Sequence, residues 1–113
     1  MNMHEYQQQA KQTAFYPNRG DNFVYPSLGL VNEAGEVAGK IKKLMRDQNK
    51  FSPADLSAED RVVLQKEIGD VLWYVTILAD EIGLSLEDIA AANLEKLQGR
   101  QGRDTLTGDG DDR

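Results

Sequence analysis

The chain has 113 residues and a mass of 12.6 kDa, which is enough for one domain with a single core. Its formal net charge of −6 argues against nucleic acid or an anionic membrane as a partner, because both need clustered Lys and Arg. The absence of cysteine excludes disulfides, thiol catalysis and cysteine-based metal sites. The polar start MNMHEYQQQAKQ is unlike a signal peptide and no apolar run could span a bilayer, so we expect a cytoplasmic protein.

The first half of the chain predicts two helices. Residues 3–15 have few helix breakers and precede Pro17, so they are expected to form the first helix. PNRGDN, at 17–22, has the composition of a turn. Ser27 is the predicted N-cap of a second helix that runs to about Met45, with apolar residues at helical spacing.

The second half predicts two more helices after the loop DQNKFSPADLSAED. Ser57, with Asp60 three residues later, is typical of a helix start, and this third helix is expected to end at Gly83. Ser85 and Asp88 predict the start of a fourth helix, which ends near residue 99. The Gly- and Asp-rich segment that follows is expected to be mobile unless it docks.

These elements predict an all-α fold, an antiparallel four-helix bundle, with a domain over 1–100 and a tail over 101–113. VLWYVTILA in the third helix is apolar on nearly every side, so it must be covered on every side. Three helices of the same chain hardly suffice for that. We therefore expect a homodimer or a dimer of dimers, with Trp73 in core or dimer packing.

Two carboxylates interrupt this apolar helix. At 100° per residue, Glu67 points along the middle of the apolar stripe and Asp70 lies about 60° to one side. Unpaired charges in that position would cost several kcal/mol and would repel each other. Glu33 and Glu36 have the same spacing on the second helix, so four carboxylates are expected to converge on one point.

The convergence of acids predicts a divalent cation. Carboxylates without His or Cys favour Mg²⁺, with Mn²⁺ as a possible substitute, and Mg²⁺ usually takes further ligands from substrate phosphates. The predicted chemistry is hydrolysis of a phosphoanhydride. Taken alone, Glu33 and Glu36 could instead form a solvated helix edge paired with Lys40 and Lys43.

Two long segments also resemble a known family. GLVNEAGEVAGKIKKLMRD followed by LQKEIGDVLWYVTILADEIGLSLEDIAAANLEKLQGR is similar to the MazG-like, all-α nucleoside triphosphate pyrophosphohydrolases, whose signature is E-x-x-E, a gap, then E-x-x-D. The resemblance implies Mg²⁺-dependent hydrolysis of a nucleoside triphosphate, deoxy or non-standard, to the monophosphate and pyrophosphate. Metal-activated water would attack the α-phosphorus. Glu33, Glu36, Glu67 and Asp70 match the metal-binding and catalytic carboxylates, and Glu36 is favoured as the proton acceptor.

The resemblance also implies substrate contacts. Asn93, Lys96 and Arg100 in NLEKLQGR match the part of the family that approaches the phosphates. Tyr74, one turn after Asp70, is similar in position to an aromatic that packs on the nucleoside. Base selection is expected from the first helix and the loop after it, around Gln9, Thr13 and Asp21.

Three other interpretations remain open. A non-catalytic helical dimer with a regulatory role could keep the fold without the chemistry. Relatives that cleave phosphoribosyl-ATP share the architecture, so the substrate could be a phosphoribosyl-nucleotide. A di-iron or di-manganese bundle is disfavoured because the E-x-x-H pairs of such proteins are missing. His4, the only histidine, lies in the polar N-terminal stretch and is expected to be exposed and without a role.

Overall fold

Four α-helices and one short 3-10 helix make up the structure, a computed structural model that describes residues 1–113. In chain order they are α1 (Met3–Lys11), α2 (Val24–Gln48), η1 (Pro53–Asp55), α3 (Ala58–Glu81) and α4 (Leu86–Gly102). The structure contains no strand, so the all-helical class is confirmed. No helix combines the length and the hydropathy that a membrane span would need.

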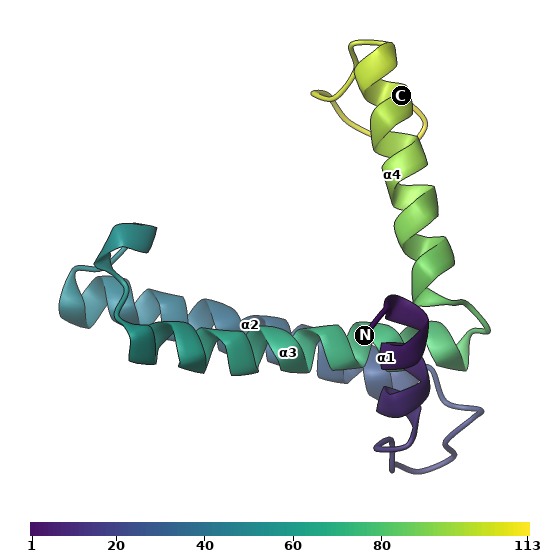
Figure 1. The fold of residues 1–113 in the computed structure, drawn as a ribbon, viewed down its shortest axis with the longest axis horizontal. Coiled ribbons are helices and arrows are strands. Elements are labelled where there is room, and N and C mark those ends of the chain that lie inside the picture. Colours follow the sequence, from purple (N-terminus) through teal and green to yellow (C-terminus); the bar gives the residue numbers. More distant parts are fainter.

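The centre of the fold is a long antiparallel hairpin of α2 and α3 (Figure 1). α1 packs across the C-terminal part of α3, where Ala10, Ala14 and Ile77 bury one another. α4 contacts α1 but turns away from the hairpin (Figure 1). The four helices of one chain therefore do not close into the expected antiparallel bundle.

The direction of α4 is set at the junction that follows α3. Gly83 adopts the left-handed conformation, with φ of 76°, and ends α3 as predicted. The buried amide of Gln7 then holds the junction from α1: its Nε2 donates to the carbonyl of Leu84 at 3.0 Å, and its Oε1 accepts from the backbone N–H of Leu86 at 2.9 Å. Two hydrogen bonds from one side chain fix the start of α4 away from the hairpin.

Helix starts in the second half agree with the sequence. Ser57 and Asp60 form the reciprocal capping box at the start of α3, and the Ser85 side chain accepts from the backbone N–H of Asp88 at the start of α4. The predicted Ser27 cap is wrong, because α2 begins three residues earlier at Val24. The Asn22 side chain accepts from the first backbone N–H groups of α2, and Ser27 instead donates to the Phe23 carbonyl inside the helix.

The first helix is shorter than predicted and ends at Lys11. Thr13 leaves the helix because the indole N–H of Trp73 donates to its hydroxyl at 2.8 Å. The next residue, Ala14, packs on Ile77 of α3. Tertiary contacts with α3 thus override the helical tendency of residues 12–15.

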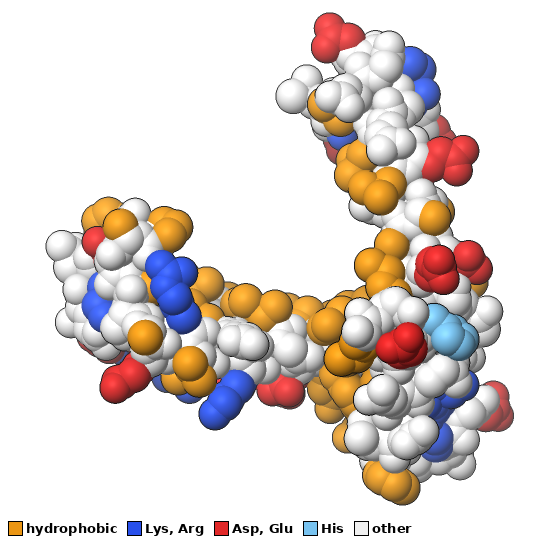
Figure 2. Space-filling model, viewed as in Figure 1, with side chains coloured by type: hydrophobic (Ala, Val, Ile, Leu, Met, Phe, Trp, Pro, Cys, Tyr) orange, Lys and Arg blue, Asp and Glu red, His pale blue; other side chains and the backbone are white.

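The core of one chain is thin. Only nine of the 113 residues are buried, and the radius of gyration is 17.0 Å, whereas a compact chain of this length is expected at about 13 Å. Figure 2 shows hydrophobic side chains along the inner side of the angle between the hairpin and α4. Many large apolar side chains of all four helices are therefore open to solvent in the single chain.

One carboxylate ties the loop between α1 and α2 to the end of α3. The Glu81 side chain is fully buried and accepts hydrogen bonds from Arg19, Gly20, Asn22 and the Tyr16 hydroxyl. Burial alone would raise its pKa, but these donors outweigh that effect and lower the pKa of Glu81 to about 2.

Replacing this carboxylate should destabilise the protein. We expect Glu81→Gln to lower the free energy of unfolding by about 2 kcal/mol, because several donors lose a charged acceptor. Urea denaturation followed by circular dichroism measures the change. Glu95→Gln, on an exposed part of α4, removes the same charge and should leave stability nearly unchanged. Equal effects of both substitutions would contradict this role for Glu81.

The same carboxylate predicts a pH dependence. Its pKa is lower in the folded chain than the ordinary value of 4.5, so the unfolded state binds the proton more readily. The stabilisation is complete above about pH 4.5 and is lost as the pH falls toward about 2. The difference between the wild type and Glu81→Gln should shrink over that range.

Candidate functional site

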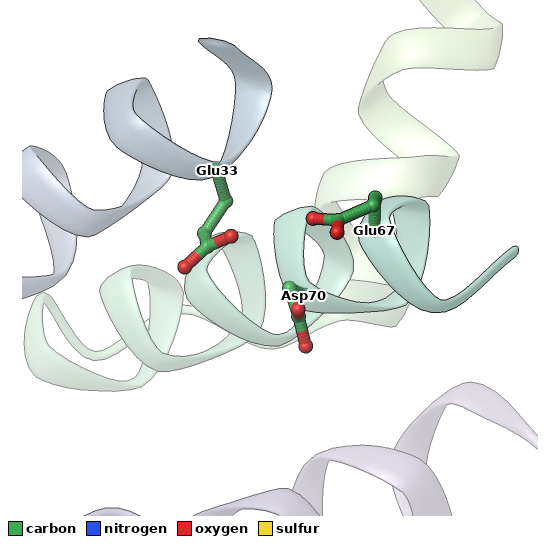
Figure 3. A group of neighbouring side chains, drawn as sticks. All are labelled: Glu33, Glu67 and Asp70. Carbon is green, nitrogen blue, oxygen red and sulfur yellow. The ribbon is translucent and has the colours of Figure 1, made fainter. Parts of the chain in front are cut away.

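Three carboxylates meet between α2 and α3. Glu33 projects from α2 toward α3, which carries Glu67 and Asp70 one turn apart (Figure 3). One carboxylate oxygen from each of the three lies within 4.8 Å of the others. The spacing of three residues on α3 puts both acids on the side that faces Glu33.

The register of the hairpin depends on a close contact one turn away. A Cβ atom on Gly29 of α2 would overlap the ring of Tyr74 on α3. Glu33 follows Gly29 by one turn, and Asp70 precedes Tyr74 by one turn on the antiparallel helix. The packing of the Tyr74 ring against the backbone at Gly29 therefore places Glu33 opposite Asp70.

The carboxylates of this group have no positively charged side chain paired with them. Partial burial and the negative charges of Asp70, Glu67 and Glu36 raise the pKa of Glu33. None of the four carboxylates forms an ion pair with a Lys or Arg side chain. The arrangement concentrates negative charge at one point of the hairpin with no protein cation to balance it.

The structure corrects the expected burial of these acids. Glu33 and Glu67 are half-buried and Asp70 is exposed in the single chain, so they do not lie in a covered apolar seam. Glu36 is also exposed and lies outside the group of three, although its charge still acts on Glu33. The open side of the hairpin, left uncovered by α4, accounts for the difference.

The donor set fits a hard divalent cation. It consists of carboxylate oxygens from two packed helices, with no nitrogen or sulfur ligand, and this favours Mg²⁺ or Mn²⁺ over softer metals. Three side chains leave further coordination positions for water or for ligand oxygens.

The predicted substrate residues do not all lie at this site. Tyr74 does, because it is one turn beyond Asp70 on α3. Burial raises its pKa, and Tyr25 and the charges of Glu33 and Asp70 add to the effect. The ring of Tyr25 lies 6.4 Å from that of Tyr74. Asn93 is on α4, where it lines a groove of about 810 Å³ with residues of α1 and α3.

Lys96 and Arg100 point toward the C-terminal tail. The Asp111 carboxylate lies 3.2 Å from Lys96 Nζ and 3.3 Å from Arg100 Nη2. Arg100 is buried and also donates to the carbonyl oxygens of Gly110 and Asp111. The tail is thus docked on α4, and within one chain neither cation reaches the carboxylates.

The residues expected to select the base lie near α1. Gln9 and Thr13 line a depression beside Trp73. Asp21 lies in the α1–α2 loop, in a small pocket that also contains Glu81. None of these three belongs to the carboxylate group of the same chain.

Sequence reasoning missed Tyr6. Burial raises the pKa of the Tyr6 phenol, and the negative charge of Asp70 adds to this effect. Tyr6 also lines the groove that contains Asn93. Nothing in the sequence marks Tyr6 as part of the site, because its position depends on how α1 crosses α3.

Comparison with known proteins identifies the family of the chain. Residues 27–103, which include the whole carboxylate group, match the family described as the MazG nucleotide pyrophosphohydrolase domain. The chain belongs to this family of nucleotide pyrophosphohydrolase domains. The resemblance seen in the sequence is thereby confirmed.

Two relatives are similar over most of their length. The chain is 42% identical to the "Gene 37 protein" of Mycobacterium phage L5, over 100% of both chains. It is 37% identical to the "Uncharacterized protein YvdC" of Bacillus subtilis (strain 168), over 76% of this chain and 85% of the relative. No solved structure matches the chain.

The close contact of α2 and α3 can be tested with two glycines of the same helix. Gly29→Ala should lower the free energy of unfolding by about 1–3 kcal/mol, because the ring of Tyr74 must move. Gly39→Ala has nothing within 4 Å of the new atom and should stabilise by up to about 1 kcal/mol through helix propensity. Thermal denaturation of both variants measures the difference. Changes of the same sign would contradict the register described above.

Proposed function

We propose that the protein hydrolyses nucleoside triphosphates, deoxy or non-standard, to the monophosphate and pyrophosphate. The observation that carries the proposal is the group of Glu33, Glu67 and Asp70 on the hairpin of a MazG-family chain. The acids of this site have no positively charged partner in the chain, and a cation held by them would keep coordination positions open. Such a site suits a substrate that supplies phosphate oxygens. In this role the protein would remove surplus or damaged nucleotides from the pool.

The carboxylates would hold Mg²⁺, or Mn²⁺ in its place. When bound, such a cation neutralises the charge that develops on phosphoryl oxygens and lowers the pKa of a coordinated water. Glu33 would hold it from α2, and Glu67 and Asp70 from α3. The raised pKa of Glu33 supports this assignment, since a cation would relieve the repulsion that causes part of it.

The reaction is a displacement at the α-phosphorus. A water oxygen forms a bond to that phosphorus, and the bond to the bridging oxygen breaks, so pyrophosphate leaves with the electron pair. Glu36 is the assigned acceptor of the water's proton. It is exposed, close enough to act electrostatically on Glu33, and outside the group that would hold the cation.

A second copy of the chain would complete the site. The thin core and the exposed apolar side chains support a homodimer, or a dimer of dimers. In that assembly α4 of one copy can lie against the hairpin of the other, bringing Asn93 and Lys96 to the phosphates. Arg100 would then act by holding the tail in place rather than by contacting substrate.

The proposed reaction is tested by its products. The protein with Mg²⁺ is incubated with canonical and modified nucleoside triphosphates and with phosphoribosyl-ATP, and pyrophosphate and orthophosphate are assayed separately. We expect pyrophosphate and monophosphate, and loss of turnover when EDTA removes the metal. Glu67→Gln should reduce kcat by roughly a hundredfold or more.

Glu59→Gln is the matched control for Glu67→Gln, because it removes one exposed charge from the first turn of the same helix, outside the carboxylate group. Its kcat should equal that of the wild type. Orthophosphate as the sole product would defeat attack at the α-phosphorus. No turnover with any substrate would favour a non-catalytic dimer.

The proposed assembly predicts the mass in solution. Light scattering coupled to gel filtration should give at least twice the 12.6 kDa of the chain. The physical reason is the large apolar area of the hairpin and α4 that one chain leaves exposed. A monomer at micromolar concentration would rule out completion of the site by a partner.

A further inference from the structure

A separate pocket lies between α2 and α3, nearer than the carboxylates to the loop that joins the two helices. It has a volume of about 170 Å³, and two lysines, Lys40 and Lys43, line it from α2. Leu64 and Val63 form part of the opposite wall on α3. Lys40 lies on the same face of α2 as Glu33, because the two are seven residues apart.

The acids of this pocket already have partners. Asp47 pairs with Arg46 at 2.7 Å, and Asp60 pairs with Lys50 at 2.7 Å while also capping α3. Lys40 and Lys43 form no ion pair with any carboxylate of the chain. In particular, the pairing with Glu33 and Glu36 that helical spacing allows is not formed. Two cations without an ion pair thus line the pocket, and the charge of Lys43 adds only a smaller effect to the Arg46 hydrogen bond that lowers the pKa of Asp47.

The surrounding charge also favours an anion. Residues 40–66 carry seven of the 13 Lys and Arg of the chain against four Asp and Glu, although the whole chain is acidic. This end of the hairpin therefore has a local positive balance, directly beside the negative carboxylate group.

The distance between Glu33 and Lys40 suits a ligand that contacts both the carboxylate group and the lysine pocket. Lys40 lies seven residues, or about 10 Å along the axis, beyond Glu33 on the same face of α2. Side chains of an α-helix lean toward its N-terminus, so the stems of Lys40 and Lys43 lean toward the carboxylates. The flexible four-carbon stem lets each ammonium move further in that direction.

We propose that Lys40 and Lys43 bind the β- and γ-phosphates, the part of the substrate that leaves as pyrophosphate. This inference rests on the proposed function and adds a subsite to it. Glu33, Glu67 and Asp70 would hold a divalent cation near the α-phosphate end, and the two lysines would hold the leaving end of the phosphate chain.

The test measures pyrophosphate itself. Inorganic pyrophosphate with Mg²⁺ is used as a product inhibitor and as a ligand in calorimetry, and the nucleoside monophosphate is used in parallel. Lys40→Gln should weaken pyrophosphate binding and raise the KM for triphosphate, each roughly five- to tenfold. Inhibition by the monophosphate should not change, and Lys40→Arg should restore most of the pyrophosphate affinity.

Lys42→Gln is the matched control. It removes the same charge from the same turn of α2, but Lys42 is exposed and does not line the pocket. Equal effects of Lys40→Gln and Lys42→Gln, or no binding of pyrophosphate by the wild type, would overturn the inference. If the wild type binds pyrophosphate through Lys40 but hydrolyses no triphosphate, the proposed reaction fails and the subsite stands.

Discussion

Gly29 lets the ring of Tyr74 lie directly on the backbone of α2, and the facing positions of Glu33 and Asp70 follow from this contact. Two antiparallel helices can slide along each other or rotate against each other. Two facing acidic side chains do not by themselves fix the relative position of the helices. The contact between the Tyr74 ring and the backbone at Gly29 fixes the relative position of the two helices. From this contact, one helical turn on each side leads to Glu33 and Asp70.

The hairpin places opposite charges at different points along its length. Carboxylates that no protein cation balances occupy its middle, and lysines that no carboxylate balances occupy its far end. Both arrangements are unfavourable for the empty protein, since like charges repel on each side. A ligand that combines a divalent cation with a polyphosphate would relieve both at once. The free energy of binding would then come mainly from neutralising these charges and not from new packing contacts.

Much of this organisation could be predicted from local sequence. The starts of α3 and α4 follow from Ser57 and Ser85 with their acids, and the end of α3 follows from Gly83. Three of the four predicted carboxylates come together, because the spacing of three residues on a helix leaves little choice of face.

What could not be predicted depends on contacts between distant segments. The direction of α4 is set by the amide of Gln7, which reaches a junction almost eighty positions later in the chain. The position of Tyr6 in the groove with Asn93 depends on how α1 crosses α3. The exposure of Asp70 was missed because the apolar pattern of α3 indicates burial without saying which chain provides the cover.

The scarcity of buried side chains in one chain has a thermodynamic consequence. If a second copy supplies the missing cover, folding and association become a single equilibrium, and its midpoint depends on how much protein is present. A melting temperature for this chain then has meaning only at a stated concentration. Substitutions of the apolar side chains that one chain leaves exposed would then shift the melting temperature as strongly as substitutions in a protein core.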